Sequence, residues 1–430
     1  MLTNIGQQFY MIADAAIVGR GVGVKALAAV GSTDWSYWLI LWTVSALTQG
    51  FATFISRYFG MKDYRIMNKA IAMSALLCAA IGIFLTAAGL AAADPLLRIL
   101  KTPEDIIDGA GLYLSTMIAG TLIVTAYNMA ASVLRAFGDG RTPLIAMIIA
   151  AVLNVALDML FVFVFKWGIF GAAIASVIAQ LVSFLYCLHR ILKLEFVELK
   201  KEYWKPDADM IRELLAFGSP LALQHIVIAI GGMILQSTIN MQGSIFVAGY
   251  TAQNKLYGLL ESTAISLGFA FTTYSAQNYG AGNTERVKAG VRTAVKISVL
   301  MAVGVGAVMA LAGTYLLRLF IDSGEAGAAE ALRIADHYLL IMSLSLTILY
   351  LLNIYRSALQ SVGVSLWSMI SGFAEFAVRV AMARAALIPA NTEILYYIEP
   401  SAWLGALLLV AVPYYICRKK ILDKAPLKIK

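Results

Sequence analysis

Residues 144–165 read LIAMIIAAVLNVALDMLFVFVF, an apolar run whose only polar side chains are those of Asn154 and Asp158. About 20 predominantly apolar residues are needed for a helix to cross a bilayer. Because backbone groups in lipid must bond within their own segment, such a run predicts a helix rather than an open strand. Similar runs recur along the chain, without the alternation of an outer-membrane barrel. The sequence therefore predicts an all-α polytopic membrane protein.

The composition agrees with this class of protein. Of 430 residues, 60% are hydrophobic and 13% are charged, against roughly 45–50% and about 25% in soluble domains. The first hydrophobic stretch begins almost at Met1, so we expect an upstream cytoplasmic segment to be missing from the sequence. Twelve stretches mark the expected transmembrane helices: 2–19, 35–56, 70–94, 108–134, 143–165, 169–188, 214–239, 245–277, 293–320, 333–361, 365–388 and 399–417.

The longest polar stretch, residues 193–213, divides these spans into two sets of six. We expect an N-terminal six-helix bundle at 1–192, a cytoplasmic linker at 193–213, a C-terminal six-helix bundle at 214–418 and a basic cytoplasmic tail at 419–430. The first helix of the N-terminal bundle is the one that we expect to be truncated.

Two short motifs occur in both halves, at equivalent spans. Aligning Gly60 with Gly280 pairs SRYFGMKDYRIMNKA with AQNYGAGNTERVKAG, and aligning Gly138 with Gly363 pairs SVLRAFG with SALQSVG. Each half has an even number of spans, so both halves enter the membrane from the same side and are predicted to be parallel repeats. Such pseudo-symmetric repeats suit transport by alternating access.

The net charge of +8 is unevenly distributed. Connections on one side of the spans carry 23 of the 33 Lys and Arg residues, with Arg356 counted among them, and the other side carries 7. The positive-inside rule then places both chain ends in the cytoplasm. We therefore expect the basic charge to reflect orientation and lipid contact, and we expect no nucleic-acid partner.

Two aspartates lie inside predicted spans of the N-terminal half. Asp14 is in the middle of the first span, and Asp158 follows Asn154 by four residues in the fifth, so these two share one helix face. Ionisable groups within a membrane are costly and usually functional. Carboxylate and amide oxygens that converge can hold protons or a sodium ion. The alternative is that the Asn–Asp pair only joins helices through hydrogen bonds.

The C-terminal half offers fewer candidates. Glu261 lies in the eighth span and Gln224 in the seventh, and both are possible substrate or cavity residues. Glu375 and Arg379 stand four residues apart in the eleventh span, and we expect them to form a structural ion pair that hides both charges from lipid.

Seven motifs, in order along the chain, resemble those of the multidrug and toxic compound extrusion (MATE) family. The resemblance covers essentially the whole sequence and implies a cation-coupled antiporter with a V-shaped twelve-helix fold in the bacterial inner membrane. The motifs are QQFYMIADAAIVGRGVGVKALAAVGS (7–32), LRAFGDGRTP (134–143) with NVALD (154–158), GIFGAAIASVIAQ (168–180), AFGSPLALQHIVIAIGGMILQSTIN (216–240), AQNYGAGNTERV (276–287), SGFAEFAVR (371–379) and EPSAWL (399–404).

The resemblance also implies where the coupling site lies. Asp14, Asn154 and Asp158 match motif positions of an N-terminal cation site, Ser176 matches a hydroxyl position in the sixth span, and Asn128 is a looser candidate. The implied coupling ion is H⁺ or Na⁺, and no other cofactor is expected. A sodium ion would be bound by Asp14, Asn154, Asp158 and Ser176. We expect cationic or amphipathic small molecules as substrates, membrane lipids as further partners, and a monomer.

A flippase for lipid-linked oligosaccharides or another amphipathic lipid is the alternative function, because related proteins use a similar scaffold. Pyrophosphate-linked cargo would call for several cations along the cleft, whereas only Lys255, Arg379 and Arg384 are counted inside spans. The sequence contains no GxxxxGK[ST] loop for an ATP-driven pump. It has neither an HExxH motif nor a recognisable Ser–His–Asp set, so we do not expect an enzyme.

Overall fold

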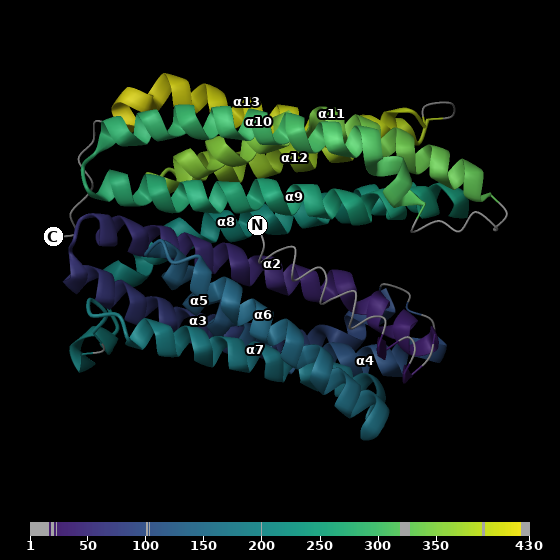
Figure 1. Ribbon diagram of the computed structural model, residues 1–430, viewed down its shortest axis with the longest axis horizontal. Coiled ribbons are helices and arrows are strands. Elements are labelled where there is room, and N and C mark those ends of the chain that lie inside the picture. Colours follow the sequence, from purple (N-terminus) through teal and green to yellow (C-terminus); the bar gives the residue numbers. More distant parts are fainter. Residues whose placement is uncertain are drawn as a thin grey trace. The chain divides into compact units, whose positions relative to one another are not determined.

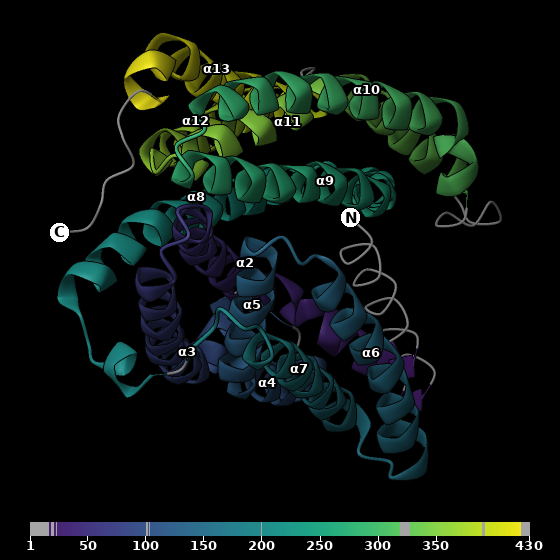
Figure 2. The same cartoon turned by 60° about the vertical axis from the view of Figure 1, so that its left-hand side comes forward.

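A computed structural model of the protein describes residues 17–18, 21–22, 24–99, 102, 104–198, 200–318, 327–388 and 392–422. All regular secondary structure in these residues is helical (Figures 1 and 2). The first expected span, at 2–19, and Asp14 within it lie outside the described residues, apart from the helical residues 17 and 18.

The first compact unit comprises residues 2–222. In it α5 packs against α2, α3 and α7, and α6 lies beside α7 (Figure 2). Helices α4 and α5 form one expected span that bends by 46° at Gly120. Its helical segments are α2 (Val24–Gly60), α3 (Tyr64–Ile99), α4 (Glu104–Ala119), α5 (Thr121–Ala136), α6 (Arg141–Asp158), the π-helix η1 (Met159–Val164), α7 (Gly168–Leu192) and the 3₁₀ turn η2 (Lys201–Trp204).

The second unit comprises residues 223–430. Helix α11 packs against α9, α10 and α13 (Figure 1). Its apolar side chains contribute much of the core cluster that the described residues form in this unit. Helix α12 packs against α13. The helices are α9 (Ser244–Gly280), α10 (Thr284–Leu317), α11 (Ala328–Ser361), α12 (Ser365–Ala386) and α13 (Ile394–Leu422).

Helix α8 (Ala208–Asn240) belongs to both units. The division between the units falls between Ala222 and Leu223, inside this helix. The polar stretch 193–213, which the sequence indicates as the linker, therefore groups with the first unit, together with the first half of α8.

The membrane-spanning character of the helices confirms the predicted fold class. Among the described residues, nine helices are long and apolar enough to cross a bilayer, or ten when the bent α4–α5 pair is taken as one span. Helix α9 is not among them, and it carries the polar residues Gln253, Asn254 and Glu261. Each of the eleven spans expected from residue 35 onward overlaps a helix in the part of the chain that the structure describes.

The two repeated sequence motifs form the same turns in both units. Gly138 after α5 and its counterpart Gly363 after α11 have φ values of +88° and +84°. Lys62 after α2 and the aligned Gly282 after α9 have φ values of +58° and +76°. Left-handed backbone is easy only for glycine, so three of these four positions carry the residue that the turn favours. The repeat is thus a repeat of structure as well as of sequence.

Candidate cation-coupling site

Asn154 and Asp158 lie one turn apart on α6, and both side chains are 0% exposed. Ser176, on the neighbouring α7, is also buried. The amide Nδ2 of Asn154 donates a hydrogen bond to Ser176 Oγ at 3.2 Å. Within the described residues, Asn154 Oδ1 accepts no hydrogen bond. The structure therefore joins two of the predicted site residues directly and holds Asp158 one turn away, while Asp14 lies outside the described residues.

The backbone changes its helical form directly after Asp158. Met159–Val164 is a six-residue π-helix, and Trp167 N donates to Phe161 O at 2.8 Å where the segment ends. The rings of Phe161 and Trp167 stack with centroids 4.9 Å apart. Wider π turns are rare and frequently mark functional sites. The sequence MLFVFV gives no sign of this change, so the sequence analysis missed it.

The chemistry of this site follows from burial. A carboxylate that is removed from water needs a proton, a cation or hydrogen-bond donors to offset its lost hydration. The Asp158 carboxylate, Asn154 Oδ1 and the Ser176 hydroxyl are oxygen ligands of the kind that bind hard cations. Such a group of atoms can bind a proton on the carboxylate or a sodium ion between the oxygens.

Two further polar residues lie on the neighbouring helices. Gln180 follows Ser176 by one turn on α7, and its buried Oε1 has no hydrogen-bond partner among the described residues. The four-residue spacing within GIFGAAIASVIAQ could have identified it, because both residues share one helix face. Asn128 on α5 donates Nδ2 to Val124 O of its own helix at 2.9 Å and makes no described hydrogen bond to Asn154.

The second unit contains a buried network of four charged side chains. Arg379 Nη2 lies 3.1 Å from Glu375 Oε2, the contact expected from their spacing. Arg379 also binds Glu399 through two hydrogen bonds, of 3.0 Å from Nε and 2.7 Å from Nη2. Glu375 also accepts a hydrogen bond from Arg356 Nη2 at 2.5 Å. The network therefore joins α11, α12 and α13 and is larger than the single pair in the sequence analysis.

This network corrects the position assigned to Arg356. The charge count treated Arg356 as a connecting residue, but it lies inside α11 and is buried against Glu375. Its Nε donates to Ser371 Oγ at 2.9 Å. With its amide turned to satisfy both atoms, the buried Gln224 accepts from Arg356 Nε at 3.1 Å and donates to Ser368 O at 3.2 Å. Gln224 therefore contacts the network, and its role as a substrate or cavity residue stays a prediction.

Glu261 occupies a different position, on α9. It is partly buried, close to Tyr257 and within electrostatic reach of Glu399 and Arg379. The two arginines of the network are already matched by Glu375 and Glu399. Glu261 is thus a third carboxylate beside a cluster whose charges are balanced.

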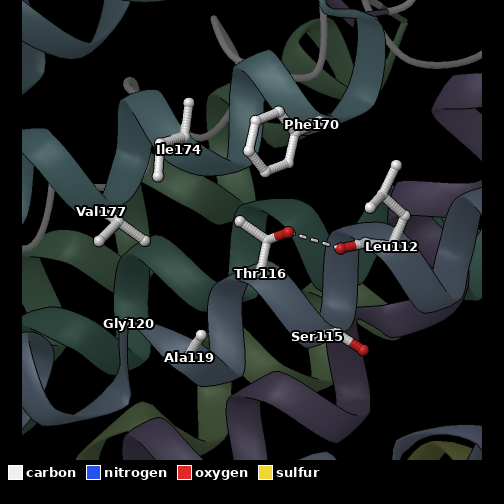
Figure 3. Close-up of a pocket in the computed structure, with 8 residues that line it drawn as sticks. All are labelled: Leu112, Ser115, Thr116, Ala119, Gly120, Phe170, Ile174 and Val177. Atoms are coloured by element: carbon white, nitrogen blue, oxygen red, sulfur yellow. Dashed lines mark hydrogen bonds between the residues drawn. The ribbon is translucent and has the colours of Figure 1, made fainter.

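A lateral groove of about 480 Å³ lies on the first unit and contains none of the predicted site residues (Figure 3). It runs between α4 and α7, where the chain bends at Gly120. A Cβ added at Gly120 would lie 2.6 Å from Val177 Cγ2, so the Val177 side chain can pack against the backbone at the bend only because the residue is glycine. Most of its lining is apolar: Leu112, Ser115, Thr116, Ala119, Gly120, Phe170, Ile174 and Val177.

Comparison with known protein families identifies the class. The MatE family model matches residues 1–160 and 220–383. The probable multidrug resistance protein YpnP of Bacillus subtilis (strain 168) is 32% identical over 331 residues, which are 76% of this chain and 74% of the relative. The probable multidrug resistance protein YoeA of the same organism is 27% identical over 431 residues, 98% of this chain and 92% of the relative. The chain belongs to the MatE family of membrane transporters.

Solved structures support the same fold. A MOP superfamily transporter from Pyrococcus furiosus superimposes with a TM-score of 0.89 at 23% identity, covering 99% of this chain and 94% of that chain. An outward-facing multidrug resistance MATE family transporter superimposes with a TM-score of 0.87, also at 23% identity and with the same coverage. The resemblance drawn from the seven motifs is confirmed.

Proposed function

We propose that the protein is a secondary antiporter that exports cationic or amphipathic small molecules in exchange for protons or sodium ions. The observation that carries this proposal is the fully buried Asp158 on α6, one turn from Asn154 and its hydrogen bond to Ser176. A carboxylate in that position favours a coupling ion over simple helix joining, because joining needs only the amide and the hydroxyl. Asp14 is the proposed second carboxylate of the site.

The site can couple two ligands if they compete for the same charge. A proton or sodium ion on the carboxylate removes the charge that attracts a cationic substrate. Linkage is reciprocal, so a bound substrate lowers the affinity for the coupling ion by the same factor. Alternating access by the two repeats would then convert the ion gradient into export.

The relatives support drug-like substrates. YpnP and YoeA are named as probable multidrug resistance proteins, and MepA of Staphylococcus aureus, 25% identical over 273 residues, as a multidrug export protein. From the family membership we propose a location in the bacterial inner membrane, and the charge bias supports cytoplasmic termini. The proposal includes membrane lipids as partners, a monomeric state, and no cofactor besides the coupling ion.

The flippase alternative finds no support in the buried cations. Arg356 and Arg379 both contact carboxylates, which already neutralise their charges. A pyrophosphate group would have to displace Glu375 or Glu399 from them. The second unit is therefore a poor site for pyrophosphate-linked cargo.

Export from proteoliposomes tests the proposed function. Purified protein should expel an ethidium-like dye when a pH gradient or a sodium gradient is imposed separately, and the effective gradient identifies the coupling ion. Equal dye movement with neither gradient would contradict an ion-coupled antiporter.

A further inference from the structure

The segment between α7 and α8 is held firmly against the first unit. We call residues 193–207 the strap; Leu199 within it lies outside the described residues. The buried amide of Asn68 on α3 donates Nδ2 to Phe196 O at 2.9 Å and accepts from Glu198 N at 3.0 Å. One side chain of α3 thus satisfies both a donor and an acceptor of the strap backbone, as a neighbouring strand would.

An aromatic cluster strengthens this attachment. The ring of Phe196 lies 5.3 Å from that of Phe59 and 5.0 Å from that of Phe137, and stacks on Tyr64 at 5.8 Å. Phe59 lies in the last turn of α2, Tyr64 is the first residue of α3, and Phe137 follows the last residue of α5. Offset and edge-to-face ring contacts of this kind are favourable beyond the area that they bury. Phe196 therefore anchors the strap to three helices at once.

The end of the strap fixes the start of α8. Asp207 forms an ion pair with Lys69, the residue after Asn68 on α3. The same carboxylate accepts a hydrogen bond from Met210 N at 3.0 Å and so caps the first turn of α8. Because one side chain binds α3 and caps α8, the beginning of α8 is tied to the first unit.

The first half of α8 continues to pack on that unit. Phe217 meets Phe54 of α2 edge to face at 5.6 Å, and the guanidinium of Arg57 lies 5.4 Å from the Phe217 ring centroid. A Cβ added at Gly50 would lie 2.4 Å from Gly218 Cα, so α2 and α8 touch backbone to backbone. These contacts pack Phe217 and Gly218 of α8 closely against α2.

Helix α8 has a weak point directly after these contacts, at Pro220. Pro220 lies inside α8 and cannot donate the hydrogen bond that a helix would make to Ala216 O. Ser219 Oγ donates a hydrogen bond to Leu215 O, one turn earlier in the helix, at 2.7 Å. Such a bond from serine to the helix backbone favours bending of the helix. The unit boundary falls two residues further on, after Ala222.

Beyond this point the helix packs on the second unit. Gln224 lies against Gly372 of α12, where an added Cβ would be 2.7 Å from Gln224 Cγ. A Cβ added at Gly231 would lie 3.3 Å from Arg379 Cδ. The two halves of α8 are thus bound to different units, and the proline separates them.

We propose that the strap and residues 208–219 move with the first unit as one body, and that α8 bends at Pro220 during the transport cycle. The polar strap is then not a flexible tether, although its composition suggests one. The functional consequence rests on the proposed transport activity, whereas the position of the weak point can be tested without it.

Cross-linking tests the two parts of this proposal in a background without native cysteines. Lys69→Cys with Asp207→Cys, joined by a short bifunctional thiol reagent, should leave the dye export rate unchanged. Ala216→Cys with Leu223→Cys, stapled across Pro220, should slow export several-fold, since i, i+7 side chains share one helix face. The matched control is Asp209→Cys with Ala216→Cys, a staple of equal length upstream of the proline, which should have little effect.

Two cross-linking results would contradict the proposed hinge. Export blocked by the 69–207 cross-link, or unaffected by the 216–223 staple, would overturn the proposal. Dye export by the same cysteine variants is also measured before cross-linking. If these uncross-linked samples export no dye, the proposed function fails, and the hinge is left to be tested by hydrogen exchange. Hydrogen exchange provides the readout that needs no transport: amides 221–224 should exchange faster than those on both sides, and Pro220→Ala should slow them. Uniformly slow exchange along α8 would also overturn the proposal.

Discussion

Asn154 Nδ2 donates to Ser176 Oγ across 3.2 Å, and this hydrogen bond joins α6 to α7 one turn before the buried Asp158. The bond uses one donor of the amide and leaves Asn154 Oδ1 without a hydrogen bond among the described residues. An acceptor oxygen is thus buried on the same helix as the Asp158 carboxylate, one turn away. That arrangement suits a site that binds a cation in one state and a proton in another.

The first prediction concerns the carboxylates of the proposed site. Asp158→Asn and Asp14→Asn should each abolish ion-driven dye export, because neither amide can exchange a charge. Thermal unfolding should show that both variants remain folded. The control is Glu261→Gln in the second unit, which should reduce export only mildly. Normal export by both aspartate variants, with none from Glu261→Gln, would place the coupling site in the other unit.

A second prediction follows from the charged network of the second unit. Glu399→Gln leaves the buried Arg379 with part of its charge unmatched. Breaking a buried ion pair in this way costs about 3–5 kcal/mol, which should appear as a large fall in Tm. Removing both charges, in Arg379→Met with Glu399→Met, should recover most of the loss.

An exposed ion pair is the control for this experiment. Arg333 and Glu330 are 2.7 Å apart on the surface of α11, and exposed pairs contribute about 0–1 kcal/mol. Glu330→Gln should therefore change Tm little. If Glu399→Gln and Glu330→Gln had equal small effects, the buried network would not stabilise the second unit.

A third prediction is a pH dependence of the strap. The hydrogen bond from Lys69, followed by that from Met210 N–H, lowers the pKa of Asp207 below its ordinary value. A lowered pKa contributes stability above the carboxyl's ordinary pKa of about 4, and this stability is lost as the pH falls through the folded value. The Tm difference between the wild type and Asp207→Asn should therefore shrink as the pH falls from 6 to about 3. A Tm difference that stayed constant would contradict the role given to the Lys69–Asp207 pair. The control is Glu198→Gln, because the Glu198 carboxylate pairs with the exposed Lys200.

A fourth prediction concerns orientation. Single cysteines at Asn283 and Lys424 should resist impermeant thiol reagents added to intact cells, whereas one at Gly327 should react. The charge bias places the first two positions in the cytoplasm. Labelling of all three from outside would reverse the proposed orientation.

The sequence predicts the fold class well, because lipid imposes one requirement on every span. Long apolar runs must become helices, and the eleven runs from residue 35 onward do so. The repeats were predictable for a similar reason, since glycine at Gly138 and Gly363 marks turns with positive φ. The division inside α8 was not, because it depends on packing contacts such as that between Gly50 and Gly218, which have no local signature.

The candidate site was predictable in part. Buried polar residues in an apolar run identify Asn154 and Asp158, and the helical period places them on one face. The π-helix after Asp158 has no sequence signal. The roles of Glu399 and Arg356 were missed because their partners lie on other helices, 20 and 19 residues away in the sequence. Spacing within one helix reveals only the pair Glu375–Arg379.

We propose that substrate and coupling ion compete for the carboxylates of the first unit. The direct measurement is proton release on substrate binding, made by calorimetry of the detergent-solubilised protein in buffers of different ionisation enthalpy. A cationic substrate should release protons within a limited pH range, and Asp14→Asn or Asp158→Asn should reduce that release and flatten the pH dependence of the affinity. If sodium is the coupling ion, the affinity should instead fall with sodium concentration at fixed pH. A substrate affinity that changes with neither pH nor sodium concentration would contradict competition at these carboxylates.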